Sequence, residues 1–364
     1  MQKKGSVAVA LLMAIGIFTV SGCNIAYENE NKNLTENSDQ IHNEPSVTTE
    51  PYIPPVVVEM NNEDVHKGRL ILVNKDYEYI DGSNPNIVNI AQMKNESYSV
   101  NTNDMTLDAE MIQHINDMLK DFSEQTGITD VLANSGYRSY DQQQELYNAH
   151  LEATGQGTSL LVAPPGRSEH HTGYAMDFAI NDGQTYPALK NEGQYSWIYE
   201  NAARYGMILR YTEKNQDFTG YSPESWHFRY IGTPQAAVVN RMGISYEEFI
   251  NFIRDFSYDE PLEYKYSDSE FYKIYFVPVD SEKNVTEIPI SYEAFSSDIE
   301  NSYSISGNNI DGFIVTLKTD KLPDDYNEML FDMFKTPEQS VSDYESPTEP
   351  DQQNQDNTDE ANAE

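Results

Sequence analysis

Four ionisable side chains in two short stretches of the sequence could together hold a metal ion and use it. Residues 167–180 read RSEHHTGYAMDFAI and contain the pattern S-x-H-x-x-G-x-A-x-D, whose histidine is His170 and whose carboxylate is Asp177. A second stretch, 47 positions after Asp177, supplies Glu224 and His227. Two histidines and one carboxylate are a common ligand set for catalytic zinc, with a fourth position left for water. Glu224 is then free to accept the proton of that water, so the sequence predicts a zinc site that hydrolyses a peptide bond.

The alternation of side chains predicts the strands that carry these residues. In residues 174–180 large apolar side chains occupy one face, whereas Asp177 lies between two alanines on the other. Small neighbours leave room for a metal ion and a substrate. His227 alternates with the aromatic residues around it, which predicts a second strand with Glu224 in the turn that enters it. Taken singly, each ligand candidate could instead be an ordinary buried polar residue, and we expect this simpler role for the neighbouring His171.

One cation lies at a predicted junction between a strand and a helix. Residues 128–134 have the pattern of a strand, and Ser139 with Gln142 fits the capping box of a helix over 140–153. Arg138 stands between them, where a side chain can face a cleft. Its planar guanidinium group suits a carboxylate or a developing oxyanion, although an isolated arginine is more often a surface charge.

Three blocks of sequence resemble the VanY-type D-alanyl-D-alanine carboxypeptidases, a family within the group of zinc peptidases that includes lysostaphin-like enzymes and the hedgehog fold. The blocks are 135–139 (SGYRS) with Gln143, the pattern in 168–177, and 224–227 (ESWH). They occur in the order of the family, and the resemblance covers roughly residues 65 to 257. It implies an α+β fold: a small antiparallel sheet with flanking helices that carries the zinc site.

The resemblance also implies roles for individual residues. The zinc ligands would be His170, Asp177 and His227, which bind one Zn²⁺ ion per chain, and Glu224 would be the catalytic base. The residues expected against the substrate are Arg138, which would steady it and the oxyanion, with Ser168, Gln143 and Trp226. The implied reaction removes the terminal D-alanine from peptidoglycan stem peptides during cell-wall remodelling, and glycopeptide resistance is one process that such a reaction can serve.

Two kinds of alternative stay open at this point. An enzyme with the same zinc site could be an L,D-carboxypeptidase that trims tetrapeptide stems, or a dipeptidase that acts on free D-Ala-D-Ala. A non-catalytic wall-binding lipoprotein could also keep the fold. The last alternative is disfavoured because a binding module has no use for a base such as Glu224 beside a metal-bound water.

Charge and the first residues of the chain bear on partners and location. The net charge of −37 argues against nucleic acid as a partner, because phosphate binding needs clustered positive charge. Lys3 and Lys4 precede an apolar run over 7–20, which is short for a membrane span and ends in VSGC. This is similar to a bacterial lipoprotein signal, with lipid on Cys23, the only cysteine. We therefore expect an exported protein anchored by lipid on the outer face of the cytoplasmic membrane.

These observations divide the chain into five parts. Residues 1–23 are the expected signal peptide, 24–64 a disordered acidic tether and 65–257 the catalytic domain. Within the catalytic domain, the apolar run over 68–74 is expected to be a buried strand. Residues 258–334 alternate as a small β-rich appendage, which could pack on the catalytic domain or bind wall polymer. Residues 335–364 are low in complexity and acidic, as disordered tails are.

Overall fold

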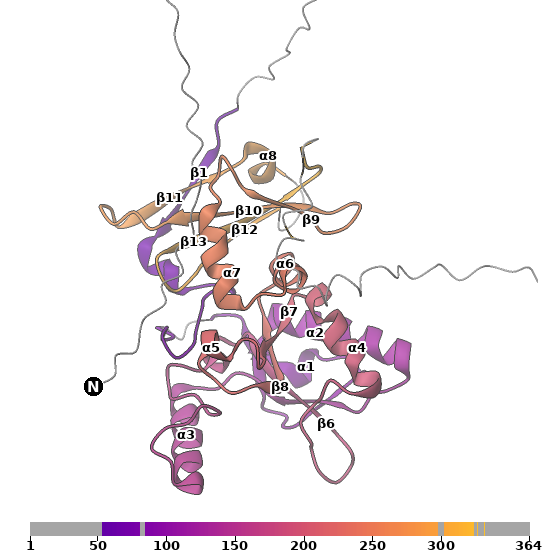
Figure 1. Ribbon diagram of the computed structural model, residues 1–364. Helices are drawn as coiled ribbons and strands as arrows, with labels where there is room; N and C mark the ends of the chain where they lie inside the picture. The colour runs from indigo at the N-terminus through magenta and orange to yellow at the C-terminus, as the bar shows by residue number, and fades with distance from the viewer. Residues whose placement is uncertain (1–52, 81–83, 298–301, 324–325, 327–330, 332–364) are drawn as a thin grey trace, which may run out of the picture. The chain divides into compact units, whose positions relative to one another are not determined.

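The computed structural model describes residues 53–80, 84–297, 302–323, 326 and 331 (Figure 1). The expected signal peptide with Cys23, most of the expected tether and the acidic tail lie outside these residues, so what the sequence indicates about them stays a prediction. In the part of the chain that the structure describes, no helix has both the length and the apolar character that crossing a bilayer requires.

A five-stranded sheet forms the centre of the catalytic part. Its strands lie in the order β3 (Ser99–Val100), β5 (Val131–Ser135), β6 (Ala175–Ile180), β8 (Glu224–Tyr230) and β7 (Met207–Tyr211). Every neighbouring pair is antiparallel except β3 and β5. The expected antiparallel sheet with flanking helices is therefore confirmed.

One face of this sheet is covered by α2 (Ala109–Thr126). Apolar side chains such as Met111, Ile115 and Phe122 recur at helical spacing along α2 and are fully buried. The helix ends at Gly127, whose φ of 74° is a left-handed cap conformation that glycine adopts without steric cost. The same core contains parts of α1 (Ile90–Met93), β4 (Thr106–Asp108), which pairs with β2 (Ile87–Asn89), α4 (Ser196–Asn201) and η4 (Ala202–Tyr205).

Shorter elements complete the catalytic part. These are α3 (Tyr140–Thr154), which begins with the predicted capping box of Ser139 and Gln142, η2 (Glu169–Thr172), η3 (Gly193–Tyr195) and α5 (Gln216–Thr219). Two helices, α6 (Gln235–Met242) and α7 (Tyr246–Phe252), then lead through η5 (Ile253–Asp255) to the C-terminal region. In Figure 1, α7 runs between the two regions.

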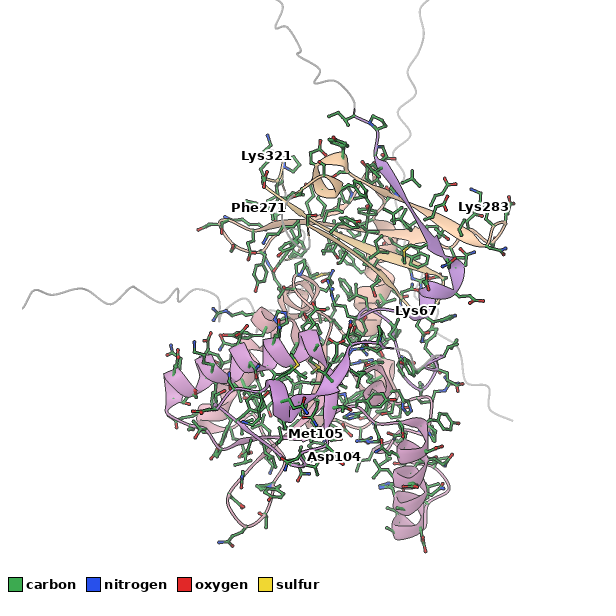
Figure 2. All side chains as sticks on the ribbon, turned by 180° about the vertical axis from the view of Figure 1, so that it is seen from behind. Lys67, Asp104, Met105, Phe271, Lys283 and Lys321 are labelled. Atoms are coloured by element: carbon green, nitrogen blue, oxygen red, sulfur yellow. The ribbon has the colours of Figure 1, made fainter. Side chains whose placement is uncertain are left out.

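The C-terminal region is β-rich, as the alternating sequence indicates. One sheet has the order β12 (Tyr303–Gly307), β13 (Gly312–Thr319), β10 (Phe271–Pro278) and β9 (Leu262–Lys265). A second pairing joins β11 (Val285–Ile290) to β1 (Val56–Asn61), and α8 (Tyr292–Phe295) follows β11. Figure 2 shows the side chains of Phe271, Lys283 and Lys321 on this region, and those of Asp104 and Met105 on the catalytic part.

The two regions share a hydrophobic core. Leu262, Ile274 and Ile314 of the C-terminal sheet are buried in one cluster with Val238 of α6 and Phe249 of α7. The C-terminal region therefore packs on the catalytic part, which is the first of the two possibilities that the sequence left open.

Three local expectations differ from the structure. Residues 56–64, expected in the tether, form β1 and the start of η1 (Asn62–His66), because β1 pairs with the distant β11. Residues 68–74 are largely buried but are not a strand: the Leu72 N–H donates to the carbonyl of Asn308, and the Asn309 side chain donates to the Leu72 carbonyl. Glu224 is the first residue of β8 and does not lie in the preceding turn.

Candidate active site

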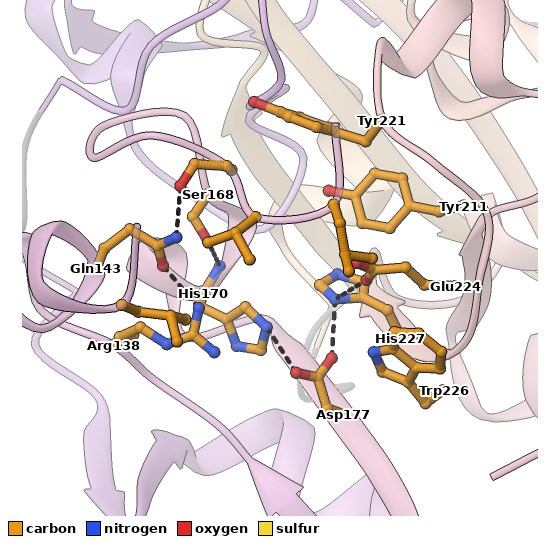
Figure 3. A pocket seen from close by; sticks show the side chains of 14 residues that line it. Arg138, Gln143, Ser168, His170, Asp177, Tyr211, Tyr221, Glu224, Trp226 and His227 are labelled. Carbon is orange, nitrogen blue, oxygen red and sulfur yellow. Dashed lines mark hydrogen bonds and ion pairs between the residues drawn. The ribbon is translucent and has the colours of Figure 1, made fainter. Parts of the chain in front are cut away.

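The pairing of β6 with β8 brings two of the three candidate ligands together. Asp177 lies directly opposite His227 in this antiparallel register, and opposing side chains on one face are about 5 Å apart. His170 comes from η2, one short turn before β6. A potential ligand atom from each of these three residues lies within 4.8 Å of the other two. Figure 3 shows the three side chains pointing toward one another.

Specific atoms of the three potential ligands face one another. Asp177 Oδ2 lies 3.2 Å from Nε2 of His170, and Asp177 Oδ1 lies 3.0 Å from Nδ1 of His227. The two imidazole rings meet edge to face, with centroids 5.0 Å apart. Burial alone would raise the pKa of Asp177, but the two histidines outweigh burial and hold that pKa well below its usual range. Asp177 is thus kept as a carboxylate.

The remaining nitrogen of each histidine contacts a protein acceptor. Nδ1 of His170 lies 2.6 Å from the carbonyl oxygen of Gly136, and Nε2 of His227 lies 3.3 Å from Oε2 of Glu169. Glu169 is fully buried, and its pKa lies well below the ordinary value because Arg210 and Arg229 outweigh the effect of burial. Contacts of this kind orient the imidazoles of metal sites.

Glu224 lies beside the ligands. Its Oε2 is 3.7 Å from Nδ1 of His227, and its side chain is only 11% exposed. Burial raises the pKa of Glu224 to about 7, and the negative charge of Asp177 adds to that effect, whereas His227 and Arg138 oppose it. A carboxylate with a pKa near neutrality can both accept and return a proton, which a general base requires.

Arg138 lies between β5 and α3 and is held in place from both elements. Its Nη2 donates to Oγ of Ser135 at 2.8 Å, and its Nη1 donates to Oε1 of Gln143 at 2.6 Å. The amide of Gln143 in turn donates to the carbonyl of Ala163 at 2.6 Å. Burial lowers the pKa of Arg138, and the charges of Asp177 and Glu224 oppose this shift.

All eight site residues predicted within the described chain line one cavity of about 230 Å³. Its walls are Arg138, Gln143, Leu146, Leu161, Val162, Ala163, Ser168, His170, Asp177, Tyr211, Tyr221, Glu224, Trp226 and His227. His171 is not among them: its ring nitrogens contact the Arg138 carbonyl and the Gly166 N–H, so it has the structural role expected for it. Cys23 lies outside the described residues.

Three ionisable residues of the site were not predicted from the sequence. Tyr211 packs against His227 with ring centroids 4.7 Å apart and an angle of 49° between the ring planes, and Tyr221 meets Tyr211 edge to face. Tyr211 ends β7, and its place beside His227 follows only from the order of the strands in the sheet. Glu169 stands at a variable position of the S-x-H pattern, and no local signal shows that an acid there is buried.

Comparison with known proteins gives relatives with the same chemistry. Residues 104–233 match the VanY family, described as D-alanyl-D-alanine carboxypeptidase. A D-alanyl-D-alanine carboxypeptidase of Enterococcus faecium is 31% identical over 262 residues, which are 71% of this chain and 78% of the relative. The bifunctional D-Ala-D-Ala dipeptidase and carboxypeptidase VanXYC of Enterococcus gallinarum is 33% identical over 34% of this chain and 68% of its own.

A solved structure is similar over about the same share of this chain as the Enterococcus faecium relative. The vancomycin resistance D,D-dipeptidase VanXYg, crystallised with a D-Ala-D-Ala phosphinate analogue, is 29% identical and superposes with a TM-score of 0.64 over 72% of this chain and 99% of its own. Identity above 30% across more than two thirds of the Enterococcus faecium relative goes beyond a shared fold. The chain therefore belongs to the VanY family of zinc-dependent D-alanyl-D-alanine carboxypeptidases.

Proposed function

We propose that this carboxypeptidase removes the terminal D-alanine from peptidoglycan stem peptides, with Glu224 as the base and Arg138 as the substrate-binding cation. The observation that carries the proposal is that a buried carboxylate and a half-buried guanidinium group share one cavity with the His–Asp–His ligand set. Binding modules do not require this combination, because an ionisable group is costly to bury unless its charge is used or paired.

The donor atoms present fit zinc. His170, Asp177 and His227 offer two imidazole nitrogens and one carboxylate oxygen, which are ligand types of catalytic zinc sites. When bound, zinc supplies a Lewis acid that polarises the scissile carbonyl and lowers the pKa of an attacking water.

Glu224 is the residue that moves protons in this proposal. Its carboxylate accepts a proton from the water as the water attacks the scissile carbonyl carbon. It then donates that proton to the nitrogen of the leaving D-alanine as the C–N bond breaks. A pKa near 7 suits both steps, because neither protonation state is strongly disfavoured at neutral pH.

Arg138 and Trp226 orient the substrate. The guanidinium group of Arg138 can bind the terminal carboxylate of the peptide or the developing oxyanion, both of which are anions that suit its geometry. Ser135 and Gln143 hold that group by hydrogen bonds, so the Arg138 side chain loses little conformational freedom when substrate binds.

The cavity favours a carboxypeptidase over a dipeptidase. Among the described residues that line it, the carboxylates are Asp177 and Glu224, one a proposed ligand and the other the proposed base. A free dipeptide would bring an ammonium group that finds no further carboxylate there, whereas the amino side of a longer peptide is a neutral amide. An L,D-specific activity on tetrapeptide stems remains the second candidate, because it would use the same charges.

We further propose that the enzyme acts outside the cytoplasmic membrane, anchored through lipid on Cys23. The support is the lipobox-like end of the apolar run at VSGC. Incorporation of a labelled fatty acid into the wild-type chain, and its loss in Cys23→Ala, would test this anchor. Labelling that persists in the variant would contradict it.

Mass spectrometry of stem peptides tests the activity. The purified enzyme with one equivalent of zinc is incubated separately with muramyl pentapeptide, muramyl tetrapeptide and free D-Ala-D-Ala. Conversion of penta- to tetrapeptide is expected. Cleavage of tetrapeptide alone would establish L,D-specificity, cleavage of the free dipeptide alone would establish a dipeptidase, and zinc binding without any product would favour a wall-binding protein.

A further inference from the structure

We infer that Glu169 is a positioning residue of the metal site, which accepts a hydrogen bond from Nε2–H of His227 and so presents Nδ1 of that ring to the metal. The inference rests on the proposed role of His227 as a ligand. It concerns how the protein chooses between the two ring nitrogens, which the ligand pattern in the sequence does not specify.

The geometry separates the two nitrogens of His227. Nδ1 faces the cluster, 3.0 Å from Asp177 Oδ1, whereas Nε2 lies 3.3 Å from Oε2 of Glu169. A neutral imidazole carries one N–H, and an ionised carboxylate can only accept a hydrogen bond. Each ring nitrogen thus faces a carboxylate that could accept the single N–H. With a metal ion held by Asp177, Glu169 is the acceptor left for that N–H, so the proton would lie on Nε2 and the lone pair of Nδ1 would be free for the ion.

Two buried arginines hold the Glu169 carboxyl group in place. Its Oε1 accepts a hydrogen bond from Nε of Arg210 at 2.9 Å and another from Nη1 of Arg229 at 3.0 Å. The side chains of all three residues have no solvent exposure. Oε1 is therefore occupied by the two cations, and Oε2 is the oxygen turned toward His227.

The support of Glu169 reaches beyond the segment that matches the family. Arg210 also forms two hydrogen bonds with Glu247 of α7, at 2.6 and 3.0 Å, and Glu247 accepts a third from the side chain of Asn74 at 2.9 Å. Both Asn74 and Glu247 lie outside residues 104–233. Two arginines and two glutamates thus form a buried array without net charge, and one end of it contacts a metal ligand.

His170 is oriented differently. Its Nδ1 lies 2.6 Å from the carbonyl of Gly136, so Nε2 is the nitrogen that faces Asp177. The structure thus presents Nε2 of one histidine and Nδ1 of the other. An anionic acceptor also makes the imidazole of His227 a stronger donor to a metal than a neutral carbonyl acceptor would.

The wild-type protein allows a direct test. The enzyme labelled with ¹⁵N in histidine is saturated with zinc, and the long-range couplings between ring nitrogens and carbon-bound protons are recorded by NMR. We expect His227 with its proton on Nε2 and the metal on Nδ1, and His170 with the reverse. A proton on Nδ1 of His227 would overturn the inference without any variant having to fold.

A pair of variants separates positioning from general stabilisation. Both Glu169→Gln and Glu247→Gln remove a charge that pairs with Arg210, but only Glu169 contacts His227. The zinc dissociation constant, measured by competition with a chromophoric chelator, should rise roughly 10- to 100-fold in Glu169→Gln. It should rise by a smaller factor in Glu247→Gln, in which Arg229 still holds Glu169.

Equal weakening in both variants, or unchanged zinc binding in Glu169→Gln, would show that Glu169 only stabilises the fold. Neither experiment uses a substrate. A failure of D-alanine release would therefore count against the proposed function while leaving this inference intact. Conversely, unchanged zinc binding in Glu169→Gln would overturn this inference and leave the proposed function intact.

Discussion

Three acidic side chains lie close together in the site, and their partners give them different chemistry. Asp177 lies between two histidines and Glu169 between two arginines, so the pKa of each is held well below the ordinary value against the effect of burial. Glu224 is buried without a hydrogen-bonded cation, and its pKa rises to about 7. Pairs of carboxyl groups with pKa values pushed apart are a sign of divided roles.

Replacing Glu224 by Gln tests the role of the base. The amide keeps the size of the side chain but cannot accept a proton, so kcat should fall by roughly 10²- to 10⁴-fold. Because Glu224 is not one of the three ligands, the zinc content by atomic absorption should stay at one ion per chain. Near-normal turnover in this variant would assign the proton transfer to another group.

Replacing Arg138 by Lys tests the anion-binding role. A lysine keeps the charge but not the planar group that contacts Ser135 and Gln143 together. We expect kcat/KM for the pentapeptide to fall by roughly 10²- to 10³-fold. Arg167→Lys is the matched control, since Arg167 contacts Glu78 at the partly exposed surface, and a comparable loss in the control would mean that the effect is not specific to the cavity.

The three ligands and the base could be predicted as individual residues because they stand in two short sequence patterns with fixed spacing. Their orienting partners could not. Glu169 acquires its role only when Arg210, Arg229 and His227 are brought around it from β7 and β8. Such a role depends on three-dimensional neighbours and has no signature in one stretch of sequence.

At the scale of elements, one turn sets the distance between two ligands. Gly173 ends η2 with a φ of 75°, between His170 and Asp177. A Cβ added there would lie 2.1 Å from Cδ1 of Ile87. Backbone conformation and space therefore both select glycine, and the chain turns from η2 into β6 within a few residues.

Gly173→Ala should lower both stability and metal affinity. The left-handed conformation alone costs an L-residue roughly 1–2 kcal/mol, and the contact with Ile87 adds to this cost. Gly155→Ala is the control, because Gly155 has a similar φ of 68° but open space around its Cβ position. Thermal unfolding and chelator competition should show that only the change at Gly173 weakens zinc binding, and equal effects at the two positions would contradict this.

The pairing of Glu247 with Arg210 links α7 to β7 and makes stability depend on pH. Burial alone would raise the pKa of Glu247, but Arg210 outweighs it and the pKa is lowered. A lowered folded pKa means that the pairing stabilises the fold above the unfolded value of about 4.3 and is lost as the pH falls through the folded value.

Glu247→Gln should therefore be less stable than the wild type at pH 7, by roughly 1–3 kcal/mol. The difference between the two proteins should shrink as the pH falls below about 4, because the Glu247 carboxylate of the unfolded wild-type chain then binds a proton that the paired carboxylate of the folded chain does not. Urea unfolding at several pH values measures it. A difference that stays constant down to pH 3 would show that charge is not the cause.

Elements with local signals were predicted well, and those that depend on distant partners were not. The capping box that begins α3 is present as expected. The run over 68–74 has the composition of a strand, yet side chains and carbonyls near Asn308 and Asn309 satisfy its backbone. The strand β1 was missed because its partner β11 is more than two hundred residues away in sequence.

At the scale of the molecule, one hydrophobic core spans the domain boundary that the sequence predicts at residue 257. Side chains from β9, β10 and β13 are buried against α6 and α7 in the same cluster as Ile208 and Ile231 of the catalytic part. The array that holds Glu169 includes Glu247 of α7. Helix α7 thus both carries Glu247, which is part of the array around Glu169, and packs against the C-terminal sheet.

A chain cut after residue 257 should accordingly fail to fold cooperatively. It would uncover apolar partners of Leu262, Tyr264, Ile274, Ile314 and Phe331. Each fully buried apolar side chain contributes roughly 1.5–3 kcal/mol, and a domain is stable by only about 5–15 kcal/mol in total, so this loss leaves no margin. Calorimetry of residues 53–257 beside 53–334 measures the effect. A sharp unfolding transition and full zinc binding in the shorter chain would establish residues 65–257 as an independent catalytic domain.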